Sequence, residues 1–166
     1  MFLKPKLVID GLIAFVVALY LETGCVPISF VIKEKRIMFL HHILTREEDA
    51  LISRVFWAQV NRPAPGDWCH VVTEDLKDLG MEHLTFSAIS EMKKDTLKTL
   101  LKKKVMETAL NYLEGEKEKS SKFRSRSFPY LRTQPYLSNL CSWPSKIKLL
   151  YFQWRTRMIK VGYNYG

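Results

Sequence analysis

The sequence predicts an all-α fold, which we expect to be a small irregular multi-helix domain with a basic, proline-broken C-terminal segment. Apolar residues recur mostly at helical spacing, and the period-two alternation typical of a strand persists nowhere along the 166 residues. The chain has only 7 glycines, and it is 47% apolar and 26% charged, which is ordinary for a globular protein. A chain of this length can bury a real core, so we expect one compact domain.

The first segment, residues 7–21, is an apolar run interrupted by Asp10 and Gly11. Such a run imitates a secretory signal or a short membrane anchor. A membrane-spanning helix needs about 20 apolar residues, however, and no small-residue cleavage site follows Ala18. We therefore favour a buried helix or an unrelated leader over a working signal or anchor.

A buried helix and a capped helix are expected next. Residues 28–44 are apolar on almost every side apart from one charged turn, which is typical of a helix buried on most sides. Thr45 and Glu48 have the spacing of a capping box, which predicts a second helix over residues 46–60. We expect the following side chains of that helix to point inward: Leu51, Ile52, Val55 and Phe56.

Capping residues mark two further helical segments. Asp67 has the position of an N-cap, and Gly80 that of the glycine that follows a helix end. Thr85 or Ser87 then begins a short helical turn that ends at Met92.

Asp95 leads the longest periodic segment of the chain. Its spacing predicts an amphipathic helix whose lysines lie opposite an apolar stripe, and we interpret it as core scaffold. The stripe consists of Leu97, Leu100, Leu101, Val105, Ala109 and Tyr112.

The charge of the chain is distributed very unevenly. Residues 1–118 carry 16 Lys or Arg and 17 Asp or Glu, whereas residues 119–166 carry 10 Lys or Arg and no carboxylate. The whole net charge of +9 therefore lies in the last third, which also holds 10 aromatic residues. We divide the chain into an apolar leader (1–17), a helical scaffold (18–118) and a basic, aromatic-rich loop with a C-terminal helix (119–166), and composition sets the boundary at residue 119.

This last part is expected to have three sections. Residues 119–126 are Ser-rich and basic, which is typical of a flexible loop. Prolines punctuate residues 128–140, so we expect an extended or turn-rich stretch. Pro144 suits the first turn of a final helix over residues 144–161.

The final helix is expected to be apolar on two sides, with basic residues between them. Such a helix usually lies between two partners, one of which is its own core. The other can be a further domain, or a nucleic-acid strand that contacts Phe152. The main apolar face comprises Ile147, Leu150, Tyr151, Trp154, Met158 and Val161; the narrower stripe comprises Leu149, Phe152 and Ile159.

A basic, aromatic and acid-free segment favours nucleic-acid binding, because Lys and Arg attract phosphates and aromatic faces stack on unpaired bases. We expect RNA or DNA as the partner, single-stranded rather than duplex, and no small-molecule substrate. The predicted cationic contacts are Lys122, Arg124, Arg126, Arg132, Lys148, Arg155 and Arg157, and the predicted stacking residues are Phe128, Tyr130 and Phe152. The alternative is that these residues only pack and solvate the helix.

No signature of catalysis is visible in the sequence. Polymerases and nucleases need carboxylates that converge on two metal ions, but the chain has no Asp-Asp pair. The acidic residues 47–49 are explained as the first turn of a capped helix. His41 and His42 point about 100° apart on a helix and cannot chelate one ion together. We therefore predict a protein that is not an enzyme and has no cofactor or metal.

The cysteines indicate the cellular compartment. Cys25, Cys69 and Cys141 are odd in number, far apart, and absent from any C-x-x-C pair. They predict neither a zinc site nor a disulfide framework and favour a reducing environment. We expect a cytoplasmic or nuclear protein.

Six stretches, in order, carry a resemblance to a known family. They are ALYLETGCVPISFVIKEKRIMFLHHIL from Ala18, TREEDALISRVFWAQ from Thr45, PAPGDWCHVVTEDLKDLG from Pro63, MKKDTLKTLLKKKVMETALNYL from Met92, LRTQPYL from Leu131 and FQWRTRMIKVGYNYG from Phe152. Together they resemble the region downstream of the reverse-transcriptase core in LINE-type (non-LTR) retrotransposon polyproteins of animals. Residues 1–17 do not match.

The resemblance implies a non-catalytic fragment of a retrotransposon endonuclease–reverse transcriptase. The family's fuller proteins carry a cleavage domain, an RNA-directed DNA polymerase with paired aspartates, and often a Cys/His zinc knuckle. None of those catalytic or zinc-binding positions is present here. The implied role is a helical extension that helps to hold template RNA or target DNA, with the missing polymerase domain as a protein partner. A helical protein–protein docking module, or an inert truncated product, is the alternative.

Overall fold

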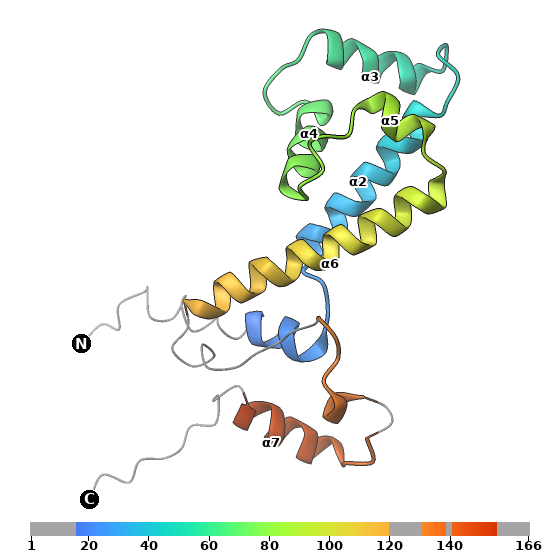
Figure 1. Cartoon of the computed structure of the whole chain (residues 1–166). Coiled ribbons are helices and arrows are strands. Elements are labelled where there is room, and N and C mark those ends of the chain that lie inside the picture. The colour runs from blue at the N-terminus through green and yellow to red at the C-terminus, as the bar shows by residue number, and fades with distance from the viewer. Residues whose placement is uncertain (1–15, 120–130, 139–140, 156–166) are drawn as a thin grey trace, which may run out of the picture. The chain divides into compact units, whose positions relative to one another are not determined.

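The computed structural model of the chain describes residues 16–119, 131–138 and 141–155, and these residues form the all-α fold that the sequence predicts (Figure 1). Within those ranges the regular elements are α-helices and one short 3-10 helix, and no strand occurs. The chain divides into a central unit, residues 26–109, and a terminal unit, which comprises residues 1–25 and 110–166. Length alone suggested one domain, but contacts group the two chain ends separately from the middle.

The central unit is built around helix α2. This helix contacts three others, and Figure 1 shows them gathered around its C-terminal half. The elements are α2 (Ile28–Leu44), α3 (Leu51–Asn61), α4 (Trp68–Asp78), α5 (Phe86–Glu91) and the first part of α6 (Lys94–Glu118). Their shared core contains Ile37, Leu40, Ile43, Phe56, Val72, Leu76, Leu79, Met81, Ile89, Leu97 and Leu101. The predicted helix over residues 28–44 is confirmed, but its burial on most sides is not, because Ile28, Ile32 and Phe39 are exposed.

Polar contacts fix α2 against its neighbours. Arg36 donates from Nε and NH2 to the two oxygens of Asp75, at 2.6 and 2.8 Å, and this carboxylate is buried. Such a two-bond fork also orients the groups it joins. Lys33 pairs with Asp78 one turn away. His41 donates from Nε2 to the carbonyl oxygen of Met92 at 2.9 Å, which ties α2 to the end of α5.

An aromatic cluster joins four helices of the central unit. The Phe56 ring lies edge-on to Trp68 and Phe86, with ring centres 6.1 and 5.3 Å apart. Phe39 meets Trp68 in the same way at 5.7 Å. Edge-to-face contacts of this kind are favourable beyond the area they bury. The cluster is therefore a structural core that spans α2, α3, α4 and α5.

Two predicted helix boundaries are confirmed by their hydrogen bonds. Gly80 has φ of 64°, and its N–H donates to the Lys77 carbonyl, while the Met81 N–H donates to the Leu76 carbonyl. This pair of bonds is a Schellman motif, which requires the left-handed residue that glycine supplies. The Thr85 hydroxyl accepts from the Ala88 N–H at 3.2 Å and caps α5.

The predicted capping box at Thr45 is wrong. The Thr45 hydroxyl donates back to the His41 carbonyl at 2.9 Å, so it closes the last turn of α2, and α3 begins only at Leu51. Asp67 occupies the N-cap position of α4, but its carboxylate accepts from the Ala64 N–H in the preceding loop. In both cases the side chain bonds to a backbone group that precedes it in the chain, and not to an N–H of the helix that follows.

The predicted inward face of α3 is also largely wrong. Ser53 and Phe56 are buried, whereas Leu51 is 76% exposed and Ile52 and Val55 are exposed as well. The apolar residues of this helix cover more than half of its circumference. The sequence pattern therefore does not reveal which part of that surface meets α2.

Helix α6 follows the predicted stripe with one exception. Leu97, Leu101, Val105, Ala109 and Leu113 recur at a spacing of four and are buried. Tyr112, which the sequence placed on this stripe, is exposed because it lies about 100° around the helix from Leu113. The helix continues through Gly115 and ends at Glu118.

The terminal unit combines both ends of the described chain. Its elements are the helix Val16–Thr23, the last part of α6, the 3-10 helix η1 (Pro135–Leu137) and α7 (Ser145–Arg155). Extended residues surround η1, which agrees with the turn-rich stretch that the prolines predict. Pro144 precedes α7, and its carbonyl accepts from the Lys148 N–H at 3.1 Å. The core contains Val17, Ala18, Leu21, Leu113, Leu131, Tyr136 and Phe152.

Candidate nucleic-acid interface

The structure describes four of the ten predicted contact residues, and all four belong to the terminal unit. They are Arg132, Lys148, Phe152 and Arg155. The remaining predicted residues lie outside the described residues: Lys122, Arg124, Arg126, Phe128, Tyr130 and Arg157. Geometry can therefore be assigned to the predicted final helix and to the proline-rich stretch, but not to most of the basic loop.

A buried carboxylate organises the described part of this surface. Glu22 is 1% exposed and accepts from three groups that lie far away in the sequence. The Tyr136 hydroxyl donates to Oε2 at 2.9 Å, and Arg155 Nε donates to Oε1 and Oε2 at 2.8 and 3.1 Å. The Gln134 N–H donates to the Glu22 carbonyl at 2.9 Å. Together these bonds hold η1 and α7 against the helix Val16–Thr23.

The surroundings of this network shift the pKa of two side chains in it. Burial first, and then the Glu22 carboxylate, raises the pKa of the Tyr136 hydroxyl well above its ordinary value. Burial alone would lower the pKa of the Arg155 guanidinium, but the hydrogen bond and charge of Glu22 outweigh burial and raise it. Tyr136 is therefore neutral and Arg155 cationic at neutral pH. Because Glu22 balances its charge, Arg155 attracts phosphate less than an unpaired cation would.

The chain passes very close to itself where the helix Val16–Thr23 ends. Gly24 has φ of 70°, and a Cβ atom built on it would lie 2.2 Å from the backbone carbon of Arg132. The Thr133 hydroxyl donates to the Thr23 carbonyl at 2.7 Å beside this contact. Only glycine fits both the backbone angle and the space. Arg132 itself is exposed.

Phe152 does not have the exposure expected of a stacking residue. It is 9% exposed and lines a cavity of about 610 Å³ together with Leu19 and Lys148. Ile147 and Leu150, which the sequence placed on the core face of this helix, are exposed. Leu149, on the same narrower stripe as Phe152, is 56% exposed as well. Neither of the two predicted apolar stripes of α7 is therefore buried as a whole.

Lys148 is half-buried beside the proline-rich stretch. Its Nζ donates to the Ser138 carbonyl at 3.1 Å, which anchors the stretch to α7. An ammonium group has three donors, so one such bond leaves capacity for a further acceptor. Lys146, two residues earlier, is exposed. Lys146 and Lys148 lie on the first turn of α7, where the sequence predicts basic flanks.

Sequence reasoning missed an aromatic cluster that joins η1, Trp143 and the second half of α7. The Tyr151 ring lies edge-on to Tyr136 and Trp143, with ring centres 4.8 and 5.4 Å apart. The Arg155 guanidinium carbon lies 5.8 Å from the Tyr136 ring centre and 6.0 Å from that of Tyr151. Trp143 belongs to the basic, aromatic segment of the sequence, but no spacing rule predicts that Trp143 and Tyr136 both contact Tyr151.

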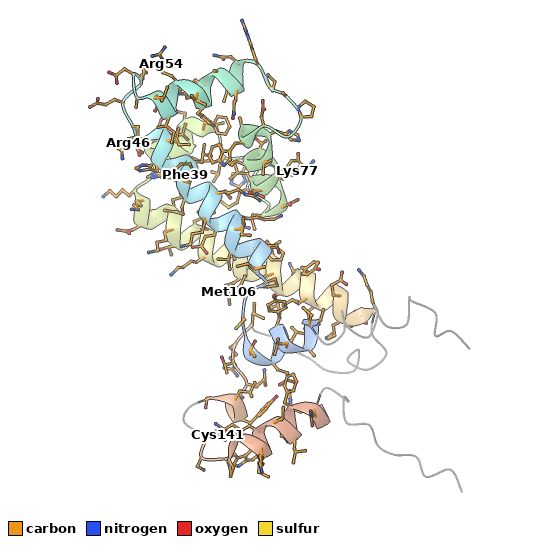
Figure 2. All side chains as sticks on the ribbon, turned by 180° about the vertical axis from the view of Figure 1, so that it is seen from behind. Phe39, Arg46, Arg54, Lys77, Met106 and Cys141 are labelled. Carbon is orange, nitrogen blue, oxygen red and sulfur yellow. The ribbon has the colours of Figure 1, made fainter. Side chains whose placement is uncertain are left out.

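The cluster lines a cavity of about 420 Å³. Gln134, Pro135 and Cys141 complete its wall, and Cys141 is labelled beside α7 in Figure 2. The cavity combines aromatic faces, one amide and one guanidinium. Such a combination suits a flat, polar-edged ligand better than an aliphatic one.

The histidines and the apolar helices of the described residues show neither a metal cluster nor a single membrane span. No group of three or more His, Cys, Asp or Glu that could hold a metal ion occurs in the described parts of the chain. His41 is buried and bonded to Met92, and His42 is exposed beside Arg46. Over those same parts, no single helix is long and apolar enough to cross a membrane. Val16–Thr23 and α2 meet the two criteria only when they are taken together, with a break between them.

Comparison with known proteins gives no relative for this chain. No protein-family model, no curated protein and no solved structure matches it. The LINE-type resemblance therefore stays a prediction from the sequence. Function has to be inferred from the charge distribution of the chain and from the geometry of the terminal unit.

Proposed function

We propose that the chain is a non-catalytic fragment of a retrotransposon endonuclease–reverse transcriptase that binds RNA or DNA without sequence preference. The observation that carries this proposal is the charge distribution, with 10 Lys or Arg and no carboxylate in residues 119–166. Lys and Arg at this density release counterions from a phosphate backbone whatever its sequence. Single strands are the preferred form, because exposed aromatic side chains of the same segment, such as Trp143, can stack only on unpaired bases.

The carboxylates near this segment support the proposal, because cations balance them. Glu22 pairs with Arg155, and on the last turns of α6 Glu114 pairs with Lys117. Glu116 pairs likewise with Lys119. A phosphate backbone that approaches the terminal unit therefore meets little uncompensated negative charge from these residues.

In the LINE-type proteins that the sequence resembles, this region lies downstream of the polymerase. We infer the corresponding role for the chain, a helical extension that holds template RNA or target DNA near a polymerase domain. The chain itself supplies no reaction step in this proposal. The polymerase domain is the proposed protein partner.

The salt dependence of binding tests the proposal. Fluorescence anisotropy of a labelled oligouridine should show log affinity falling with log salt by roughly 0.7 for each phosphate that is neutralised. Changing Lys122, Arg124 and Arg126 together to Ala should lower that slope by about 2. The matched control changes Lys98, Lys102 and Lys103, exposed lysines of α6, and removes the same charge from the balanced scaffold.

Two results would contradict nucleic-acid binding through the basic segment. One is the absence of binding at low salt. The other is an equal change of slope in the loop variant and the α6 variant, which would mean that net charge alone, and not the basic segment, determines binding.

A second candidate, a helical docking module, is favoured by the exposed apolar face of α2. Ile28, Ile32 and Phe39 are exposed and line a shallow groove of about 390 Å³ on the central unit. Phe39 is labelled in Figure 2. Exposed apolar patches of this kind mark protein contacts or cause aggregation. Here the proposed occupant is the polymerase domain.

Self-association distinguishes this candidate from the first. Changing Ile28 and Ile32, the most exposed apolar residues of this groove, to Asp should abolish concentration-dependent light scattering and leave oligouridine affinity unchanged. Scattering that persists in this variant would exclude the α2 face as a docking surface.

A further inference from the structure

The cavity lined by η1, Trp143 and the second half of α7 has the features of a binding site for one flat ring. Its exposed wall is Trp143, whose side chain is 43% exposed although it contacts Tyr151. The two rings meet at 84°, so one ring presents an edge to the other. In that arrangement Tyr151 covers at most one face of the indole. A second ring can stack on the face that remains.

We infer that this cavity receives one unpaired nucleobase of a bound single strand. The inference rests on the proposed function and adds the residues that hold the base. Stacking tolerates every base, because each has a π face, and it therefore agrees with binding that ignores sequence. The volume of about 420 Å³ lies within the range of small-ligand sites, about 300–1,000 Å³.

The polar wall of the cavity matches the edge of a base. The Gln134 backbone N–H is held by the Glu22 carbonyl, which fixes the position of this residue. Its side-chain amide has both donors and acceptors, as the edges of all bases do. Tyr136 contributes only its ring, because its hydroxyl donates to Glu22.

The charge around the cavity favours a nucleic acid over a proline-rich peptide, which aromatic clefts also bind. Glu22 balances the charge of Arg155, which lines the cavity, so the uncompensated cations of this region are Lys146 and Lys148 on the first turn of α7. No carboxylate occurs in residues 119–166. An uncharged peptide would gain nothing from these cations, whereas each nucleotide brings a phosphate next to its base.

The test compares an oligouridine with an abasic strand of the same length, using the full chain and fluorescence anisotropy. Trp143→Ala should weaken oligouridine binding roughly 5- to 150-fold, which corresponds to ~1–3 kcal/mol of stacking. It should leave abasic binding and the salt slope unchanged. Trp143→Phe keeps a ring and should restore most of the affinity. Far-UV circular dichroism checks that each variant remains helical.

Trp57→Ala is the matched control, because Trp57 is 42% exposed on the central unit and lies outside the terminal unit. It should not change either affinity. Equal oligouridine affinity in the wild type and Trp143→Ala would overturn the cavity as a base site, even where salt-dependent binding continues. Loss of oligouridine affinity in Trp57→Ala to the same extent would overturn it too. Binding of a polyproline peptide in place of the oligouridine would assign the cavity to a protein ligand instead.

The two proposals fail in different ways. Absence of binding to both strands removes nucleic-acid binding as a function. Equal affinity of the wild type for the oligouridine and the abasic strand keeps the phosphate contacts and removes only the base site.

Discussion

Arg155 Nε lies 2.8 Å from Glu22 Oε1, and this bond joins the basic C-terminal helix to a buried carboxylate 133 positions earlier in the chain. A buried charge is tolerated only where opposite charge and hydrogen bonds compensate it. Tyr136 supplies the second donor. The described part of the N-terminal apolar run is therefore a helix of the terminal unit with Val17, Ala18 and Leu21 buried, while residues 7–15 of that run lie outside the described residues.

Removal of the Glu22 carboxylate is expected to destabilise the terminal unit. Glu22→Ala leaves Arg155 and Tyr136 without their acceptor, and breaking a buried pair costs about 3–5 kcal/mol. Because the Arg155 side chain is 22% exposed and can be hydrated, we expect about 2–3 kcal/mol. Hydrogen exchange in urea should show lower protection in residues 131–138 than in α4. Glu82→Ala, on an exposed loop, is the control, and equal protection in both variants would contradict the prediction.

Stability of the terminal unit is expected to fall at high pH because of Tyr136. Burial and the Glu22 carboxylate raise the pKa of its hydroxyl in the folded state, whereas an unfolded tyrosine ionises at about pH 10. Above that pH the unfolded chain has lost a proton that the folded chain retains. The free energy of unfolding therefore decreases by up to ~1.4 kcal/mol per pH unit, and the contribution is fully present below pH 10.

Tyr136→Phe removes this titration and isolates it from the ionisation of lysines and other tyrosines. The urea midpoint of the variant should be lower than that of the wild type near neutral pH, because the bond to Glu22 is missing. Between about pH 10 and 11 it should also decline less steeply. Parallel pH profiles for the two proteins would show that the Tyr136 hydroxyl is not buried.

The two threonine positions that the sequence marked as caps are expected to differ in energy. Thr85→Ala removes the bond to the Ala88 N–H and should destabilise the central unit by about 1 kcal/mol. Thr45→Ala removes only a hydroxyl that donates to carbonyls in the last turn of α2. It should lower the free energy of unfolding by only about a few tenths of a kcal/mol. Urea denaturation followed by circular dichroism measures both. A larger effect at Thr45 would restore the capping box.

These two threonines show which structural features can be predicted from the local sequence and which cannot. Helix α2, the α4 end at Gly80 and the cap at Thr85 depend on neighbours a few residues away, so local chemistry was enough to predict them. The inward face of α3 depends on where α2 lies, and the sequence does not contain that position. A wide apolar surface such as Leu51 to Phe56 therefore gives the helix but not its orientation.

The candidate site follows the same rule. Charge and aromatic content are properties of composition, and they located the terminal segment without any structure. The pairing of Arg155 with Glu22 and the meeting of Trp143 with Tyr151 depend on tertiary contacts. Phe152 is an example. The sequence predicts its stripe of the helix but assigns that stripe to a ligand, whereas Phe152 is buried and lines a cavity with Leu19.

The close approach at Gly24 gives a further prediction that the sequence alone could not have supplied. Gly24→Ala forces a left-handed angle of 70° on alanine and places its Cβ 2.2 Å from the Arg132 backbone carbon. The neighbour is backbone and cannot rotate away, so angle strain and overpacking add to about 2–5 kcal/mol. Gly80→Ala shares the left-handed angle, at 64°, but its Cβ meets nothing within 4 Å, so about 1–2 kcal/mol is expected. Hydrogen exchange should register the larger loss in the terminal unit, and equal losses would mean that Arg132 does not lie against Gly24.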